Sequence, residues 1–297
     1  MRYNVVYKFQ IQLWRHKMKK IISLIIASLM LITLCCGFAS CNKDDNVLVM
    51  ATNAAFPPYE YVEGDKFVGI DVEIAQAIAE KLGMELQIED VEFGSIIGGV
   101  VEGKYDMGMA GMTVTEERKQ SVNFSNTYAT GIQVIIVKDG SSITSLDDIF
   151  EFNADGDPVA LKDANIKVGV QQDTTGDIYS SSDISGWGFC DVEEDGTITT
   201  DRVVRYKTGA DAVEALKTDK VNMVIIDNEP AKSFVAANDG IHILEGDNEY
   251  AVEDYAICIA KENTELLDKI NKALDELKKD GTIDKIVAKY INDGSSK

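Results

Sequence analysis

The chain has 297 residues, of which 45% are hydrophobic and 27% charged, and its formal net charge is −21. This length predicts about two domains, and the composition is typical of a folded protein, which excludes general disorder. The excess of acids argues against binding to nucleic acid or to anionic lipid headgroups, because clustered Lys and Arg side chains hold such polyanions.

The first 40 residues differ from the rest of the chain. They carry six basic and no acidic side chains, so the remainder, from Cys41 onward, carries −27. The apolar run 21–34 follows two lysines, and as a helix it would span about 21 Å, short of the roughly 30 Å hydrocarbon core of a bilayer. A basic segment, a short apolar run and a patch of small residues predict an export signal over 1–40.

The small-residue patch ends in a cysteine. Ala39 and Ser40 precede Cys41, which resembles a bacterial lipobox, where the cysteine is lipidated and becomes the mature N-terminus. We therefore expect a lipid anchor at Cys41, a tether over 41–46, and an extracytoplasmic protein attached to the cell membrane. The alternatives are cleavage elsewhere, which would release the protein, and a translation start at Met18 instead of Met1.

From residue 47 onward, short apolar runs alternate with segments of helical spacing. In the first half, we expect strands at 47–51, 85–89, 105–109 and 133–138, and helices at 71–82 with Asp71 as N-cap, at 93–102, and after Thr115. In the second half, we expect strands at 167–171, 203–206, 221–227, 241–244 and 255–260, and helices from 176, at 210–218, at 229–237, and two within 265–291. This alternation predicts α/β domains with mostly parallel sheets, whose ligands bind at the carboxyl ends of strands.

Two segments interrupt this pattern, an acidic, loop-like insertion at 150–163 and a longer one at 180–201. The second contains acids at the spacing of an EF-hand loop, but Arg202 falls where that loop needs a glutamate. We therefore predict an acidic turn between two strands there, with calcium binding as the alternative.

The sequence offers little for catalysis. His16 lies in the leader, and His242 falls in an alternating strand pattern that predicts a solvent-facing side chain. No nucleophile elbow, phosphate-binding loop or dinucleotide fingerprint is present. Cys190 and Cys258 lack the spacing of a zinc site, so we expect two separate thiols, with a disulfide between them as the alternative. We predict no cofactor and no metal site.

Three strand–turn–helix segments carry the chemistry of a zwitterion site. In the first, free backbone N–H groups, the Thr113 hydroxyl and the Arg118 guanidinium can hold a carboxylate. The second places Thr174 and Thr175 at a helix start, where both can add donors to the same anion. The third puts Asp227 at the end of an apolar strand, where its carboxylate can pair with an ammonium. Each could instead serve only as a helix cap or, for Arg118, as the partner of a nearby glutamate.

These segments, in this order, resemble the extracytoplasmic polar amino acid-binding proteins of ABC importers (bacterial solute-binding protein family 3). The segments 51–61, 67–73 and 121–125 share the resemblance, which covers about 47–138, 166–178 and 203–291. It implies an α/β, two-lobed, periplasmic-binding-protein-like (type II) Venus flytrap with two crossover strands. Lobe 1 would comprise 47–130 plus 253–297, and lobe 2 would comprise 131–252. The resemblance also implies a monomeric binder that delivers a free amino acid to a permease and is no enzyme.

By this resemblance, Arg118 and Thr113 would bind the ligand's α-carboxylate with help from Thr175, and Asp227 would bind its α-ammonium. The pocket would also be lined by Thr174, Phe56, Phe93, Gly111, Ala110, Asn53 and Gln172. Relatives carry two serines in place of Ala110 and Gly111, and binders of basic amino acids often carry an acid in place of Asn53. We therefore expect a ligand with an uncharged side chain.

Two other functions are weighed against this one. A relative of cyclohexadienyl dehydratases on the same fold would need a carboxylic acid over the substrate, and no acid beyond Asp227 is expected in the lining. An extracytoplasmic sensor domain is the second alternative.

Overall fold

The computed structural model describes residues 46–244 and 252–291. The predicted export signal, the lipidation site Cys41 and the choice between Met1 and Met18 lie outside the described residues. In the described part of the chain, no helix is both long and apolar enough to cross a membrane.

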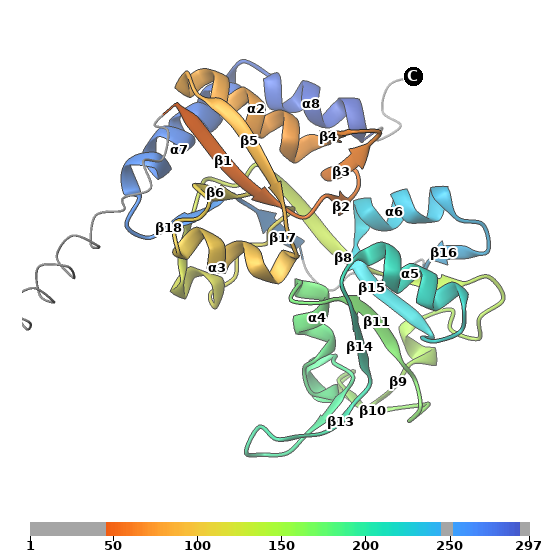
Figure 1. The fold of residues 1–297 in the computed structure, drawn as a ribbon. Helices are drawn as coiled ribbons and strands as arrows, with labels where there is room; N and C mark the ends of the chain where they lie inside the picture. Colours follow the sequence, from red (N-terminus) through yellow and green to blue (C-terminus); the bar gives the residue numbers. More distant parts are fainter. Residues whose placement is uncertain (1–45, 245–251, 292–297) are drawn as a thin grey trace, which may run out of the picture. The chain divides into compact units, whose positions relative to one another are not determined.

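A five-stranded sheet forms the first half of the fold, in the order β5-β1-β6-β18-β7 (Figure 1). Its strands are β1 (Val47–Thr52), β5 (Glu85–Asp90), β6 (Met107–Gly108), β7 (Val122–Phe124) and β18 (Cys258–Ala260). On one face, Leu48 and Met50 enter a core shared with α2 (Ile70–Leu82), α7 (Thr264–Lys279) and α8 (Thr282–Tyr290). On the other face, Ala51 packs with α3 (Ile96–Val101), which follows a 3-10 turn at Phe93–Ser95. Helices therefore cover both faces of this sheet.

A six-stranded sheet forms the second half, in the order β14-β11-β15-β8-β16, with β17 paired to β8. Its strands are β8 (Ala129–Lys138), β11 (Val168–Gln171), β14 (Val203–Tyr206), β15 (Met223–Asp227), β16 (Ile241–Ile243) and β17 (Val252–Tyr255). Its helices are α4 (Thr175–Ser180), α5 (Gly209–Lys217) and α6 (Asn228–Ala237). Val224 and Ile226 pack with α5 and α6, whereas Met223 and Ile225 pack on the opposite face with the insertions.

Two hydrogen-bonded strands connect the sheets. The first part of β8 pairs antiparallel with β17, and the second part pairs with β15 and β16. β8 follows β7 in the chain and β17 precedes β18, so both strands lead from one sheet to the other. This arrangement agrees with the two crossover strands implied by the resemblance.

Three small sheets lie outside these two. The first contains β2 (Ala55–Phe56), β3 (Glu60–Glu63) and β4 (Lys66–Val68), which we did not predict. The second corrects the loop expected at 150–163, because β9 (Phe150–Phe152) and β10 (Pro158–Leu161) pair as a hairpin. Its aromatic side chains explain the difference: the buried ring of Phe150 packs against Trp187 and Phe189 in the core of the second sheet.

The third small sheet is the insertion at 180–201. Strands β12 (Cys190–Val192) and β13 (Ile198–Asp201) flank an acidic turn, which confirms the prediction. Arg202, which occupies the place of the missing glutamate, pairs with Asp191 at 2.9 Å. An arginine bound to the first acid of the run opposes a cation at the same place.

Two local predictions are wrong. The segment after Thr115 forms only a 3-10 turn, Arg118–Gln120, because the chain then pairs with β18 as strand β7. Asp71 is not an N-cap, since that position belongs to Gly69. The Asp71 carboxylate is buried and accepts bonds from the Gly111 backbone N–H and the Tyr128 hydroxyl, both at 2.8 Å. In both cases tertiary pairing overrides the local signal.

Cys190 and Cys258 are both buried and both free, which confirms two separate thiols. Burial raises the pKa of Cys190 to about 11 and that of Cys258 to about 12. We expect neither to react with an alkylating reagent at pH 8 in the folded chain, because the thiolate is the reactive form. Both should react after unfolding without reductant. Peptide mapping by mass spectrometry reads each site separately, and a linked Cys190–Cys258 peptide would contradict the expectation.

Gly69→Ala should lower the free energy of unfolding by about 2 kcal/mol. Gly69 has a φ of +127°, and an added Cβ would lie 2.1 Å from the Tyr59 carbonyl oxygen. Gly64→Ala is the matched control, because Gly64 also has a positive φ (+65°) but a Cβ there would meet nothing within 4 Å. The midpoint temperature of thermal unfolding should fall by about 4–8 °C in Gly69→Ala and by clearly less in Gly64→Ala. Equal shifts would show that the close approach to Tyr59 is unimportant.

Candidate functional site

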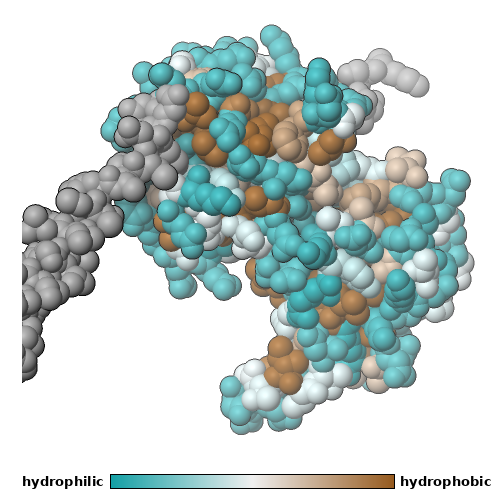
Figure 2. Space-filling model, in the orientation of Figure 1, coloured by the Kyte–Doolittle hydropathy of each residue, from teal (hydrophilic) through white to brown (hydrophobic). Residues whose placement is uncertain are grey.

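The three segments singled out in the sequence meet at one narrow cavity of about 10 Å³. It is lined by Asn53, Phe56, Glu60, Phe93, Ala110, Gly111, Thr113, Arg118, Gln171, Thr174, Thr175 and Asp227. Several of these follow the carboxyl ends of β1, β6, β11 and β15, which is where ligands bind in open α/β sheets. The surface outside this cavity is mostly hydrophilic on the face drawn in Figure 2, with hydrophobic side chains in small scattered groups.

Arg118 reaches across the cavity. Its side chain is largely buried, and Nη1 donates to the Thr113 carbonyl oxygen at 2.7 Å, while Nη2 donates to the Asp173 carbonyl oxygen at 2.9 Å. The guanidinium carbon lies 5.2 Å from the centroid of the Phe93 ring, a cation–π distance. These contacts join the turn after β6 to the turn after β11 and leave further N–H donors of the fork for an anion.

Asp227 ends β15 and is buried in the lining of the same cavity. Its backbone is the N-cap of α6, but its side chain makes no capping bond, so the capping alternative does not describe it. The carboxylate instead accepts a bond from the Tyr255 hydroxyl. Burial, followed by the charge of Glu253, raises the pKa of Asp227 to about 7. A buried carboxyl group with a perturbed pKa in a cavity is a candidate functional residue, and its ionised form can pair with a cation.

The two threonines of the second segment differ. Thr174 is the N-cap of α4: its hydroxyl accepts from the Asp177 N–H and donates to the Gln171 carbonyl oxygen, so the capping alternative describes it. The Thr175 hydroxyl is buried and points to Thr113, with 3.5 Å between their oxygens.

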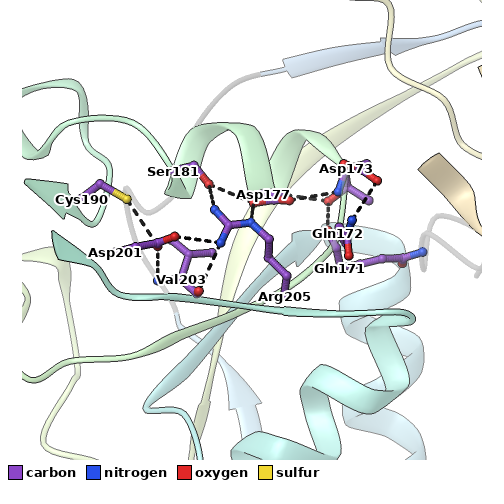
Figure 3. A network of polar contacts seen from close by, with 10 residues as sticks. Gln171, Gln172, Asp173, Asp177, Ser181, Cys190, Asp201, Val203 and Arg205 are labelled. Atoms are coloured by element: carbon purple, nitrogen blue, oxygen red, sulfur yellow. Dashed lines mark hydrogen bonds and ion pairs between the residues drawn. The ribbon is translucent and has the colours of Figure 1, made fainter. Parts of the chain in front are cut away.

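A polar network around Arg205 and Asp177 holds the turn before α4 in place (Figure 3). Arg205 donates to Asp177 Oδ1 at 2.9 Å, to Ser181 Oγ at 2.8 Å and to Asp201 Oδ2 at 2.9 Å. Asp177 Oδ2 in turn accepts from the Asp173 backbone N–H at 3.0 Å. The turn that presents the Asp173 carbonyl to Arg118 is therefore fixed by a second arginine.

The predicted place of Gln172 in the pocket is wrong, because Gln171 occupies it. Gln171 is buried and donates from Nε2 to Asn53 Oδ1 at 2.9 Å, while Asn53 Nδ2 donates to the Val91 carbonyl oxygen. Gln172 is exposed and donates to the neighbouring Asp173. Since β11 is buried on both faces, its pattern does not show which glutamine turns inward.

Two buried acids of the site were missed. Glu60, on β3, lines the cavity, so the expectation of no acid beyond Asp227 is wrong. Burial and the neighbouring Asp71 raise the pKa of Glu60 well above its usual range, while burial raises that of Asp71 to about 6. Glu253, on β17, is also buried and accepts bonds from Thr113 and Thr175. No local pattern in the sequence marked either Glu60 or Glu253.

No group of side chains in the described residues could hold a metal ion. His242 faces solvent as predicted, and its Nδ1 lies 2.8 Å from Asp139 Oδ1.

Comparison with known proteins places this fold and cavity in context. ArtP, the arginine-binding extracellular protein of Bacillus subtilis (strain 168), is 31% identical over 277 residues, covering 92% of this chain and 98% of ArtP. A mutant of ArgBP from T. maritima superposes with a TM-score of 0.67 at 35% identity, covering 82% of this chain and 95% of that structure. An ancestral arginine-binding protein bound to glutamine gives a TM-score of 0.68 at 35% identity, covering 84% and 99%.

These structures share the two-lobed periplasmic-binding-protein fold of type II. The family model of the bacterial extracellular solute-binding proteins, family 3, matches residues 48–293. The match spans both sheets, the crossover strands and every residue that lines the cavity. The chain belongs to the bacterial extracellular solute-binding proteins, family 3.

Proposed function

We propose that the chain binds a free amino acid outside the cell membrane and delivers it to the permease of an ABC importer by lobe closure. The observation that carries this proposal is a cavity with a buried arginine on one lobe and a buried carboxylate, Asp227, on the other. Members of the family are solute-binding proteins and not enzymes, so the dehydratase alternative is set aside in spite of Glu60.

In the proposed complex, Arg118 binds the α-carboxylate with donors from the turns at Thr113 and Thr175, and Asp227 binds the α-ammonium. Each charge-assisted bond contributes about 1.5–3 kcal/mol, offset by the cost of association and ordering. Two opposite charges at a fixed separation favour a zwitterion over a simple amine or a simple acid. Closure would bend β8 and β17, where both strands pass between the lobes.

Two classes of ligand side chain are supported by different residues. An uncharged side chain, our expectation from the sequence, is supported by Asn53, Ala110 and Gly111, which line the cavity without charge. A basic side chain is supported by Glu60, a carboxyl group in the same lining. The names of the relatives favour the basic class, because ArtP is named for arginine and the ancestral arginine-binding protein is bound to arginine in one structure, although it is bound to glutamine in another. We propose the uncharged class first and the basic class second.

Thermal unfolding against the twenty amino acids, cystine and ornithine tests the proposal. The chain should first be unfolded and refolded to remove any ligand retained from expression. At a concentration of 100 times Kd, a ligand should add about 2.7 kcal/mol to the free energy of unfolding. A response to glutamine above arginine supports the uncharged class, and the reverse order supports the basic class. No response to any amino acid would refute the proposal.

The remaining proposals concern assembly. We propose lipidation at Cys41, a monomeric chain, and lobes at 47–130 plus 253–297 and at 131–252. Intact mass of the membrane-extracted protein would show the lipid and the first residue. A mature chain that retains residues 1–40 would contradict the anchor.

A further inference from the structure

Glu253 occupies an unusual place in the fold. It lies on the crossover strand β17, opposite Gly131 of the other crossover strand, β8. Alternation along β17 turns Glu253 and Tyr255 inward and leaves Val252 and Asp254 exposed. The side chain is 3% exposed, so a carboxylate is buried at the hinge beside the ligand cavity.

One carboxylate oxygen of Glu253 joins both lobes and the hinge. Oε2 lies 2.8 Å from Thr113 Oγ1 on the first lobe and 2.9 Å from Thr175 Oγ1 on the second. The Gln133 amide on β8 also donates to it, at 3.3 Å. The Tyr179 hydroxyl, on α4, is also within hydrogen-bonding reach of the Glu253 carboxylate.

Counting protons decides what the two hydroxyls can do. A threonine hydroxyl has one proton to donate and lone pairs to accept, whereas an ionised carboxylate only accepts. The hydroxyls of Thr113 and Thr175 therefore both donate their single hydrogen bond to Glu253 Oε2. The Gln133 amide also lies 3.2 Å from Thr175 Oγ1, where it donates. Toward the cavity the two hydroxyls present lone pairs, which repel a carboxylate and accept from an N–H group.

We propose that Glu253 is a positioning residue of the ligand site. It turns the protons of Thr113 and Thr175 away from the cavity, so that both hydroxyls accept hydrogen bonds from the ligand's α-ammonium beside Asp227. This inference rests on the proposed amino acid function and reassigns the two hydroxyls from the carboxylate to the ammonium. Arg118 then remains the charged donor for the carboxylate.

The consequence is selectivity for the amino group. Without Glu253, each hydroxyl can rotate and donate into the cavity, which removes acceptors from the ammonium and offers donors to an acid. The measured quantity is the ratio of two Kd values, that of the deamino acid over that of the amino acid. The probes are L-glutamine with glutaramate, or L-arginine with 5-guanidinopentanoate, whichever amino acid binds the wild-type chain more tightly.

Isothermal titration calorimetry of the full chain tests this. Glu253→Leu removes the acceptor, and Thr113→Val with Thr175→Val removes the hydroxyls. We expect each change to lower the ratio at least tenfold, mostly by weakening the amino acid, with the deamino acid changed less than threefold. Adding Glu253→Leu to the double valine variant should lower the ratio no further, because Glu253 acts through the hydroxyls. The exposed Glu262→Leu is the control and should leave both Kd values unchanged.

Several results would overturn the inference. Equal weakening of both probes in Glu253→Leu would assign it a structural role only. A further loss in the valine background would mean that Glu253 acts directly on the ligand. If Glu253→Leu does not fold, the single variants Thr113→Val and Thr175→Val decide. If the hydroxyls donate to the ligand's carboxylate, which both probes carry, their removal would weaken the binding of both probes alike and overturn the inference. A wild-type chain that binds no amino acid would instead refute the proposed function itself.

Discussion

Arg118→Ala should abolish detectable amino acid binding. The guanidinium is held between the Thr113 and Asp173 carbonyl oxygens and over the Phe93 ring, so its position is already fixed and N–H donors remain for an anion. A bidentate pair with a carboxylate makes two charge-assisted bonds of about 1.5–3 kcal/mol each. Their loss corresponds to roughly a 10²- to 10⁴-fold weaker Kd, measured by isothermal titration calorimetry.

Two comparisons separate ligand binding from folding in this variant. Arg118→Lys keeps the charge but loses the planar fork, so we expect an intermediate loss of affinity. Thermal unfolding without ligand measures the effect on folding separately, because Arg118→Ala also removes bonds to two backbone carbonyl oxygens. A Kd within threefold of wild type in Arg118→Ala would remove this residue from the proposed site.

The second large effect is a pH dependence that belongs to Asp227. Ligand affinity should rise between about pH 5 and 8 and level off above. Burial, followed by the charge of Glu253, raises the pKa of Asp227 to about 7. Only the ionised form of this side chain pairs with an ammonium. Each pH unit below this pKa should therefore cost about tenfold in affinity. Calorimetry in buffers of different ionisation enthalpy should detect release of close to one proton per ligand near pH 6.

Asp227→Asn isolates this effect. The amide keeps an oxygen for the Tyr255 hydroxyl but has no charge to offer, so the affinity should fall by about two orders of magnitude at pH 8. The residual pH dependence should be small, with Glu60 and Asp71 as the other raised groups near the cavity. An unchanged pH profile in this variant would assign the titration to another group.

The free energy of unfolding should change with pH in the opposite direction to the ligand affinity. Because the folded pKa of Asp227 lies above its unfolded value, the folded chain binds the proton more tightly. Its contribution to the free energy of unfolding is full below about pH 4 and is lost as pH rises through about 7. Without ligand, Asp227→Asn should therefore be more stable than wild type at pH 8. Urea unfolding of wild type and Asp227→Asn at pH 5 and pH 8 measures how the free energy of unfolding of each chain changes with pH.

Local signals in the sequence predicted much of this molecule. β14 and the helices near 209–217 and 228–237 agree with their predicted ranges within one or two residues, because apolar spacing and caps act over a few residues. Arg118, Thr113 and Asp227 line the cavity as predicted for the same reason, since each lies in a short strand–turn segment. The hairpin at 150–163 was expected to be a loop, because its acidic residues indicate a solvated segment. Its aromatic side chains pack into a core formed by distant parts of the chain, which local spacing does not show.

The missed parts of the site depend on pairing between distant segments. Glu253 reaches Thr113 across 140 residues of sequence, through the pairing of β17 with β8. Glu60 reaches the cavity through a three-stranded sheet that no periodicity indicated. The choice between Gln171 and Gln172 depends on where the chain turns at Asp173, whose φ is +65°. None of these is encoded within a window short enough for local spacing to show it.

The most direct measurement is calorimetric titration of the refolded chain with three related probes. These are an L-amino acid, its amine without the α-carboxylate, and its acid without the α-ammonium; agmatine and 5-guanidinopentanoate serve for L-arginine. A site built on Arg118 and Asp227 predicts one-to-one binding of the amino acid and at least 100-fold weaker binding of both analogues. Equal binding of all three, or no binding of any L-amino acid in the panel, would contradict recognition of a zwitterion.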